Sequence, residues 1–353
     1  MTRARVQFLA WAPTAGRARD LAADLDGEAV TIYPKRLAER RLTPLRYAAS
    51  AVVTVGRLVR SRPRAIVVQN PPVYPAVIAL GWARLTRARF VLDSHPASFG
   101  AKDNAQAQKM LRVTSRLARS AHGVLVTTES WAEVVRSWGG TPLVLHEAPP
   151  HWSTSPTRPL RGRRPQVLFS CVFASDEPVA EVIAAARELP ELDVVVTGDP
   201  RKAPDGLLHD LPCNVRLTGW LDQVAYAAEV DACDVLLALT TEPTSVMRAA
   251  YEAGYARRVL VMSDTLSMRE LFPEAVCCAN DRDGIAAALA LAVCDHDRLV
   301  HDLDNVRARQ QRRWDNQRQA LLSMLGLEGP ETAHDLYDAS AADAEPASEA
   351  RRP

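Results

Sequence analysis

Short runs of apolar, β-branched residues alternate along the chain with longer segments whose apolar positions recur every three or four residues. In the first part of the chain these runs predict strands at Val6–Trp11, Val30–Tyr33, Ala65–Gln69, Phe90–Asp93, Gly123–Thr127 and Leu143–His146. The segments between them predict helices at Gly16–Leu25, Pro44–Val59, Tyr74–Leu85, Ala105–Ser120 and Ser130–Trp138. The strand runs are almost continuously apolar, as is typical of strands buried on both faces. The alternation therefore predicts a parallel sheet covered by helices.

The pattern is interrupted at residues 151–165 (HWSTSPTRPLRGRRP), which are rich in proline, serine and arginine and predict a linker. The alternation then restarts, with strands predicted at Val167–Cys171, Val194–Thr197, Val215–Thr218, Val235–Leu239, Val259–Met262 and Val276–Ala279. The predicted helices are Glu177–Leu189, Gln223–Val230, Ser245–Ala256, a short one ending at Phe272, and Gly284–Cys294.

The sequence thus predicts an α/β protein with two tandem Rossmann-like domains, residues 1–150 and 166–296, each with a parallel sheet. Residues 297–327 predict a charged helix that runs from Asp297 to about Leu325. Residues 328–353 are acidic and rich in alanine and serine, which predicts a disordered tail.

Composition narrows the class of protein. The net charge is +1, and 47% of residues are hydrophobic, 24% charged and 6% aromatic, as in ordinary globular domains. This balance disfavours a nucleic-acid partner. The amino terminus has too short an apolar core for a secretory signal, and prolines interrupt the least charged stretch, Ala65–Ala83, so no membrane span is predicted. Six cysteines without a C-x-x-C pair predict buried, reduced thiols in a cytoplasmic protein.

Several motifs of other enzyme classes are missing. No G-x-G-x-x-G follows the first predicted strand, and the chain has no P-loop, H-E-x-x-H or G-x-S-x-G motif. These absences disfavour dinucleotide binding in the usual Rossmann mode, P-loop hydrolysis of ATP, a zinc site and a hydrolase of the nucleophile-elbow type. We expect no metal site.

Four motifs in a fixed order carry a resemblance. They are QNPPVYP (69–75), DSHPASFG (93–100), NVRLTG (214–219) and LTTEPTSVMRAAYEA (239–253). Together they resemble glycosyltransferases of the GT-B fold, above all a bacterial branch of family 4, and QNPPVYP is similar to a loop of mannosyltransferases that extend lipid-linked chitobiose. The resemblance implies a cleft between an amino-terminal acceptor domain and a carboxy-terminal domain for a nucleoside-diphosphate sugar, the donor substrate, with no further cofactor.

The resemblance implies three donor-binding residues in the second domain, Glu252, Thr244 and Ser245, and one catalytic residue, Arg248. Glu252 would accept hydrogen bonds from the ribose hydroxyls of the donor. Thr244 and Ser245 stand where a helix is predicted to begin, whose free N–H groups and positive dipole end suit a diphosphate; both residues also serve as ordinary helix caps. Arg248 would add charge to the leaving group. Thr244 stands where many family members have a first glutamate.

Other candidate residues follow predicted strands, where open α/β sheets bind ligands. His95 and Asp93 are candidate catalytic groups that contact the donor sugar or assist the acceptor. Asn70 either shapes the acceptor slot or turns the chain, and Gly16 allows the backbone to approach a substrate. Asp176 and Glu177 either cap the helix that follows them or line the cleft.

We therefore expect a metal-independent hexosyltransferase that acts on a glycan or lipid-linked sugar in cell-envelope or exopolysaccharide synthesis. Two alternatives stay open: a nucleotide-sugar epimerase or hydrolase on the same scaffold, and a non-catalytic nucleotide-sugar-binding protein. Twelve Lys and Arg against one acid, Glu39, lie between Lys35 and Arg89. This basic run and the amphipathic helix within it indicate either a contact with the inner face of the cell membrane or an ordinary solvated face.

Overall fold

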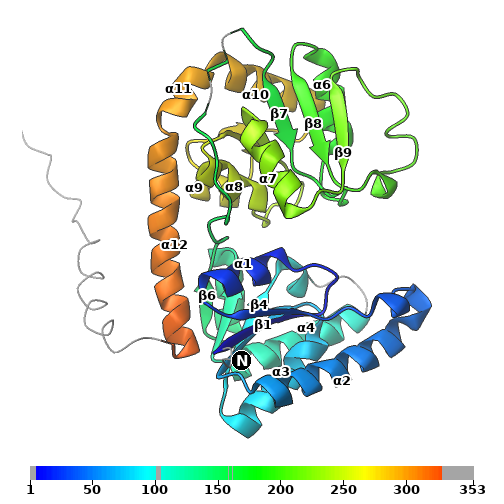
Figure 1. The fold of residues 1–353 in the computed structure, drawn as a ribbon, viewed down its shortest axis with the longest axis vertical. Coiled ribbons are helices and arrows are strands. Elements are labelled where there is room, and N and C mark those ends of the chain that lie inside the picture. Colours follow the sequence, from blue (N-terminus) through cyan, green and yellow to red (C-terminus); the bar gives the residue numbers. More distant parts are fainter. Residues whose placement is uncertain (1–4, 101–104, 158, 161, 328–353) are drawn as a thin grey trace, which may run out of the picture.

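The computed structural model describes residues 5–100, 105–157, 159–160 and 162–327, and these residues form two α/β units joined by the segment 145–165. Each unit contains one six-stranded sheet in which every neighbouring pair of strands is parallel. The amino-terminal unit lies at the bottom of Figure 1 and the carboxy-terminal unit at the top. The prediction of two tandem parallel-sheet units is confirmed.

The amino-terminal sheet has the strand order β2-β1-β3-β4-β5-β6. Its strands are β1 (Val6–Ala10), β2 (Glu28–Thr31), β3 (Ala65–Asn70), β4 (Arg89–Ser94), β5 (Gly123–Val126) and β6 (Pro142–Val144). Its helices are α1 (Gly16–Asp24), α2 (Thr43–Ser61), α3 (Val73–Thr86), α4 (Ala105–Ser120) and α5 (Glu129–Ser137).

Burial on both faces explains the continuous apolar runs of these strands. Phe8 and Val67 pack in one cluster with α1, whereas their neighbours Leu9 and Val68 pack in another with α2 and α3. Successive side chains of a strand point to opposite faces, so a strand covered on both sides needs apolar residues at every position. This two-sided cover leaves the strand ends as the places where polar residues gather.

The carboxy-terminal sheet has the strand order β12-β11-β10-β7-β8-β9. Its strands are β7 (Gln166–Phe169), β8 (Asp193–Thr197), β9 (Val215–Gly219), β10 (Val235–Ala238), β11 (Val259–Ser263) and β12 (Val276–Cys278). Its helices are α6 (Val179–Glu188), α7 (Gln223–Ala232), α8 (Arg248–Ala256), α9 (Leu266–Leu271) and α10 (Arg282–Cys294), followed by α11 (His296–His301) and α12 (Leu303–Leu325).

Helix α12 packs against both units, along one side of the molecule in Figure 1. Leu303 at its start belongs to the core of the carboxy-terminal unit. Trp314, Leu321 and Leu325 complete the amino-terminal core beneath β1 and β3. One helix that is buried in two cores fixes how the two sheets face each other.

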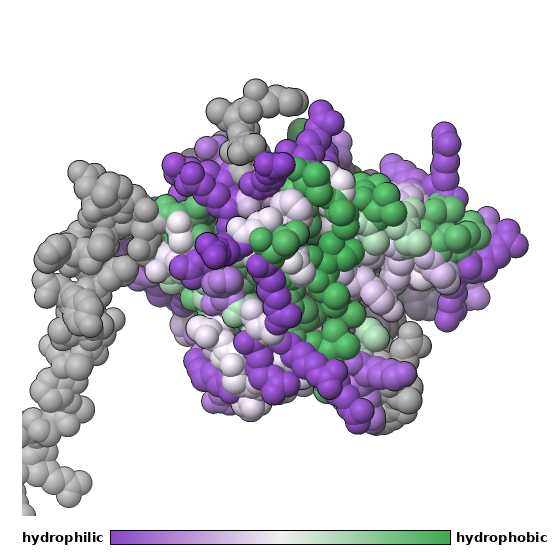
Figure 2. All heavy atoms as spheres, turned by 90° about the horizontal axis from the view of Figure 1, so that it is seen from below, coloured by the Kyte–Doolittle hydropathy of each residue, from purple (hydrophilic) through white to green (hydrophobic). Residues whose placement is uncertain are grey.

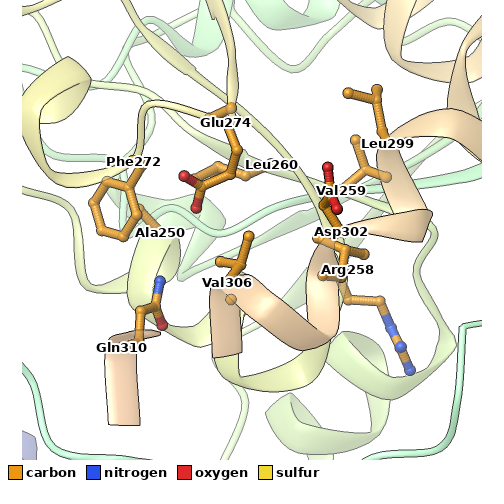
Figure 3. Close-up of a pocket in the computed structure, with 13 residues that line it drawn as sticks. Ala250, Arg258, Val259, Leu260, Phe272, Glu274, Leu299, Asp302, Val306 and Gln310 are labelled. Carbon is orange, nitrogen blue, oxygen red and sulfur yellow. The ribbon is translucent and has the colours of Figure 1, made fainter. Parts of the chain in front are cut away.

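Helices α8 and α12 cross closely because residue 254 is a glycine. A Cβ at Gly254 would lie 2.2 Å from Nε2 of Gln310, which is buried on α12. Figure 3 shows Gln310 beside Phe272 and Ala250 at a small cavity of about 30 Å³. An ion pair joins Arg309 of α12 to Glu274 in the loop before β12. The close crossing ties α12 to α8, which carries part of the site described below.

The structure corrects three predictions outside the site. The charged segment after Asp297 is two helices that meet at Asp302 instead of one, and β2 begins and ends two residues earlier than predicted. All six cysteines are free, but three are exposed, so the prediction of buried thiols is wrong for Cys213, Cys277 and Cys294. The predicted acidic tail, residues 328–353, lies outside the described residues.

Candidate functional site

A cavity of about 590 Å³ lies between the two units, where the ends of α1, β7, β8, α7 and α8 converge. It brings together four residues singled out from the sequence: Gly16, Glu177, Arg248 and Glu252. Trp152 and Trp220 add aromatic walls from the connecting segment and the loop after β9. The cavity is large enough for a small-molecule ligand.

The carboxylate of Glu252 is buried at the wall of this cavity, on the second turn of α8. The hydroxyl of Tyr226 donates to Glu252 Oε2 at 2.6 Å, and Arg248 Nε donates to Oε1 at 2.8 Å. Burial and the neighbouring carboxylate raise the pKa of Tyr226 well above its usual value, so the phenol keeps its proton. Each carboxylate oxygen retains a lone pair for another donor, such as a ligand hydroxyl.

Arg248 of the second unit forms ion pairs with residues outside that unit. Besides Glu252, its guanidinium pairs with Asp20 on α1 and lies 3.7 Å from Glu147 Oε2. Burial by itself lowers the pKa of Arg248, but these three carboxylates outweigh it and raise the pKa above its usual value. A Cβ at Gly16 would lie 3.0 Å from Arg248 Nη1, so glycine at this position leaves room for the guanidinium.

A second buried arginine, Arg17 of α1, organises the strand ends behind the cavity. It donates to Asp93 Oδ1 at 3.3 Å and to Glu147 Oε1 at 2.7 Å. Burial tends to raise the pKa of Glu147, but Arg17 and Arg248 outweigh it and lower that pKa below the usual value. His95 Nε2 lies 3.9 Å from Asp93 Oδ2, and the imidazole is about one-third exposed. Asp93 is therefore a buried brace, whereas His95 is accessible.

The other predicted residues line a second cavity, of about 980 Å³, between the β3 and β4 loops and the second unit. Asn70, Asp176, Thr244 and Ser245 all lie in its walls, together with Glu242. The side chain of Asn70 is fully buried and donates to Thr114, and its backbone oxygen accepts from the N–H of His95. Asn70 thus holds the His95 loop in place at the edge of this cavity.

Helix α8 begins three residues later than predicted, at Arg248. Glu242 precedes Pro243, which disfavours helical backbone, and the chain turns with the N–H of Ser245 bonded to the carbonyl of Glu242. Thr244 and Ser245 therefore neither cap the helix nor offer its free N–H groups. Met247, Arg248 and Ala249 bring the helix start to the 590 Å³ cavity instead.

Asp176 and Glu177 do not cap the helix that follows them, since α6 has Pro178 at its cap position and no side-chain cap. The carboxylate of Glu177 accepts from the N–H groups of Val172 and Ala174, at 2.9 and 2.8 Å. Asp176 Oδ2 accepts from the hydroxyl of Thr240 at 2.7 Å, joining the β7 loop to the β10 loop. Both acids line the cleft and fix the loops that form it.

Sequence reasoning missed Arg17, Asp20, Glu147 and Tyr226. Glu147 follows a strand end in LHEAPP, so the rule that selected His95 selects it too. Arg17 and Asp20 lie on α1 without a motif, and their partners stand up to 228 residues away. Among the described residues, no group of three His, Cys, Asp or Glu side chains is arranged to hold a metal ion.

His146, next to Glu147, predicts a sensitivity of the fold to acid. Burial and the nearby Arg313 and Arg17 lower its pKa to about 3, from the usual 6.5. The folded state then binds fewer protons than the unfolded state, so stability falls as pH drops below 6.5. Between pH 6.5 and 4.5 this residue alone should cost ~2 kcal/mol of folding stability. Measured by urea unfolding, the free energy of unfolding of His146→Gln should fall less steeply with decreasing pH than that of wild type. His209→Gln is the control for losing an imidazole. Equal slopes of this free energy against pH in His146→Gln and wild type would contradict the prediction.

The fold is similar to that of known protein families and solved structures. Residues 1–151 match the model of the family described as glycosyl transferase 4-like domain. HepE of Anabaena, solved with UDP and glucose, superposes with a TM-score of 0.70 at 14% identity, over 92% of this chain and 99% of that one. The chain has the GT-B fold.

Two further GT-B structures are similar over nearly their whole length. Sucrose-phosphate synthase from Thermosynechococcus elongatus has a TM-score of 0.69 at 16% identity, covering 91% of this chain and 98% of that one. A UDP-forming α,α-trehalose-phosphate synthase from Burkholderia xenovorans has a TM-score of 0.63 at 11% identity, covering 92% and 99%. No curated protein sequence matches the chain. The likeness of QNPPVYP to lipid-linked chitobiose mannosyltransferases stays a prediction from the sequence.

Proposed function

We propose that the protein is a glycosyltransferase that moves a hexose from a nucleoside-diphosphate sugar to a glycan or lipid-linked sugar of the cell envelope or an exopolysaccharide. One observation carries the proposal. The buried carboxylate of Glu252 and the start of α8 with Arg248 open onto the same cavity between the two units of a GT-B fold. A nucleoside diphosphate presents a ribose diol, which a carboxylate can bind, and a charged diphosphate, which a helix start and an arginine can bind.

The donor is the ligand that best complements this cavity. The free lone pairs of Glu252 suit the two ribose hydroxyls, and the N–H groups and dipole of the α8 start suit the diphosphate. Trp220 and Trp152 offer apolar surface to the base and the sugar. The structures of HepE with UDP and with UDP-glucose support a uridine nucleotide as the first candidate.

The reaction breaks the bond from the anomeric carbon to the diphosphate and joins that carbon to an acceptor oxygen. Negative charge develops on the leaving diphosphate, where Arg248 and the α8 start stabilise it without a metal ion. The acceptor hydroxyl loses its proton, and we assign His95 as its base, because this accessible imidazole adjoins both the Glu147–Arg248 group and Pro96 of the second cavity. Asp93 positions His95.

We assign the acceptor to the 980 Å³ cavity, which adjoins the donor cavity through the Asp176–Glu177 loop. Because the unit that contains it carries the basic run of Lys35–Arg89, we place the enzyme at the inner face of the cell membrane. No helix in the described part of the chain is long and apolar enough to cross a bilayer. Failure to sediment with anionic vesicles would count against this placement.

A thermal-shift panel tests the donor assignment. UDP-glucose, other UDP-sugars and GDP-sugars at about 100 Kd should include one that raises Tm by about 5 °C, with and without a chelator. A shift that chelation abolishes would contradict metal independence, and no shift with any nucleotide sugar would overturn the proposal. Conversion of the bound donor without an acceptor would instead indicate an epimerase or hydrolase. Binding of the donor without turnover on any envelope acceptor would indicate a non-catalytic binding protein.

A further inference from the structure

An apolar groove of about 510 Å³ runs over the amino-terminal unit between α2, α3 and α4. Tyr47 and Ala51 of α2 form one wall, Val77 of α3 another, and Met110 and Val113 of α4 a third. Val73 and Tyr74 of the QNPPVYP motif also line the groove, but the proposed reaction does not use it.

The groove is continuous with the proposed acceptor cavity. Tyr47, Val73, Tyr74 and Met110 line both spaces, so an occupant of one end can pass without interruption into the other. The acceptor cavity is polar at its far end, where Asp176 and Glu242 lie, and the groove is apolar. A molecule that fills both therefore has a polar end and an apolar end.

The outer end of the groove opens on an apolar face. Figure 2 shows hydrophobic residues gathered in a continuous band on the lower side of the molecule, with hydrophilic residues along its edges. Val52 of α2 is 74% exposed and Leu85 of α3 is 80% exposed, with Val55 and Val77 partly exposed near them. Contiguous exposed apolar surface of this kind marks a binding site for an apolar partner.

A cation lies beside the junction of the apolar and polar spaces, although Arg46 itself lines neither of them. The guanidinium carbon of Arg46 lies 5.8 Å from the ring centre of Tyr47, which lines both spaces. Arg46 donates to the carbonyls of Leu37 and Ala38, to the hydroxyl of Tyr33 and to Thr43 Oγ1, which lines the acceptor cavity. Its guanidinium carbon also lies 5.0 Å from the ring centre of Tyr33, and no carboxylate of the described residues pairs with it. Its charge is therefore available to an anionic group at this junction.

We propose that the groove holds the hydrocarbon chain of a lipid-linked acceptor, with the phosphate that joins chain to sugar beside Arg46. This inference rests on the proposed function and names the class of its acceptor. A chain is the occupant that fits, because the groove continues into the cavity of the reacting groups, which the surface of a second folded protein does not enter. The sugar then lies between His95 and the donor cavity, and the chain leaves toward the apolar face.

Two soluble probes that differ only in chain length test the proposal. Farnesyl diphosphate and dimethylallyl diphosphate share the allylic diphosphate, so calorimetric titration of the full chain isolates the contribution of the hydrocarbon. Wild type should bind the farnesyl probe at least about tenfold more tightly, since burying about two methylene groups gives this factor. Equal affinities would overturn the proposal.

Ala51→Trp fills the groove and should remove the preference for the longer chain. Val59→Trp is the matched control: it adds the same side chain to α2 at a position that is half exposed and outside the groove lining, and it should keep the preference. Arg46→Gln should weaken both probes by a similar factor. A preference for the longer probe that survives in Ala51→Trp would overturn the proposal. The proposal would also be overturned if wild type bound anionic vesicles or dimerised but did not distinguish the two probes.

The thermal shift with a nucleotide sugar separates this inference from the proposed function. Ala51→Trp should keep the wild-type shift, which also shows that it folds. If wild type shows no chain-length preference but its Tm still rises with a nucleotide sugar, only the groove assignment is overturned. A chain-length preference without any nucleotide shift supports the groove and overturns the donor assignment.

Discussion

Arg248→Gln is expected to lower kcat by about 10²–10³-fold with the donor sugar that the thermal-shift panel identifies. The guanidinium stands at the start of α8, on the wall of the donor cavity, where we place the diphosphate. Its stabilisation is needed most when the leaving group carries its full charge, so kcat should fall more than the affinity for the donor. Initial rates at saturating donor measure the effect.

The control for this prediction must separate chemistry from folding. Arg248 offsets the charges of Asp20, Glu147 and Glu252, so its loss leaves buried carboxylates without a partner and lowers Tm. The double variant with Asp20→Asn removes one of these charges and should regain part of the Tm but none of the kcat. Arg201→Gln, at an exposed arginine paired with Asp199, controls for the loss of a cation. Recovery of kcat in the double variant would contradict a role in charge stabilisation.

The same contacts imply a competition during donor binding. In this structure Arg248 bridges the units through Asp20, and no part of its charge is left without a carboxylate. A diphosphate that reaches the α8 start would exchange with Asp20 for the guanidinium. The bridge between the units is therefore weakest when the donor is bound, and α12, buried in both cores, keeps the units in register.

The fold was predictable because its signal is local. Strands such as Val235–Ala238 and Val259–Ser263 are buried on both faces, so every position must be apolar, and the run is visible without any partner. The edge strand β2 was misplaced by two residues because only Val30 in it is buried, which leaves almost no pattern. The break at Asp302 was missed because α11 and α12 share one charged, helix-favouring composition.

The candidate site was predictable only where a motif or a strand end marks it. Glu252 and Gly16 were found in this way, yet the reason for Gly16 is the space it leaves for Arg248, more than 200 residues along the chain. Asp20 has no local signal, since only the packing of α1 against the second unit gives it its partner, Arg248. Arg17 has none either, because its partners Asp93 and Glu147 follow strands 76 and 130 residues further along the chain. Thr244 was misassigned because the apolar periodicity extends to Ser245, whereas the chain forms a turn from Glu242 to Ser245 and the helix begins only at Arg248.

Glu252→Gln is expected to weaken binding of the donor nucleotide by about 100-fold or more. A carboxylate accepts two charge-assisted hydrogen bonds from a ribose diol, each of which stabilises the complex by roughly 1.5–3 kcal/mol. An amide offers only one acceptor oxygen, and its NH₂ group faces the second hydrogen-bond donor. Glutamine keeps the volume of the side chain and, with its oxygen toward Tyr226, that hydrogen bond, but it loses the ion pair with Arg248. The dissociation constant of the nucleoside diphosphate, measured by calorimetry, gives the effect.

Two matched variants decide whether the loss belongs to the carboxylate itself. Glu242→Gln makes the same exchange in the acceptor cavity and should leave nucleotide affinity unchanged. Tyr226→Phe removes only the hydroxyl that orients Glu252 Oε2, so it should weaken the nucleotide by about tenfold, one hydrogen bond's worth. Because ribose is common to uridine and guanosine nucleotides, the loss in Glu252→Gln should be the same for UDP and GDP whichever the protein prefers. A loss confined to one base would mean that Glu252 contacts the base and that the ribose is held elsewhere.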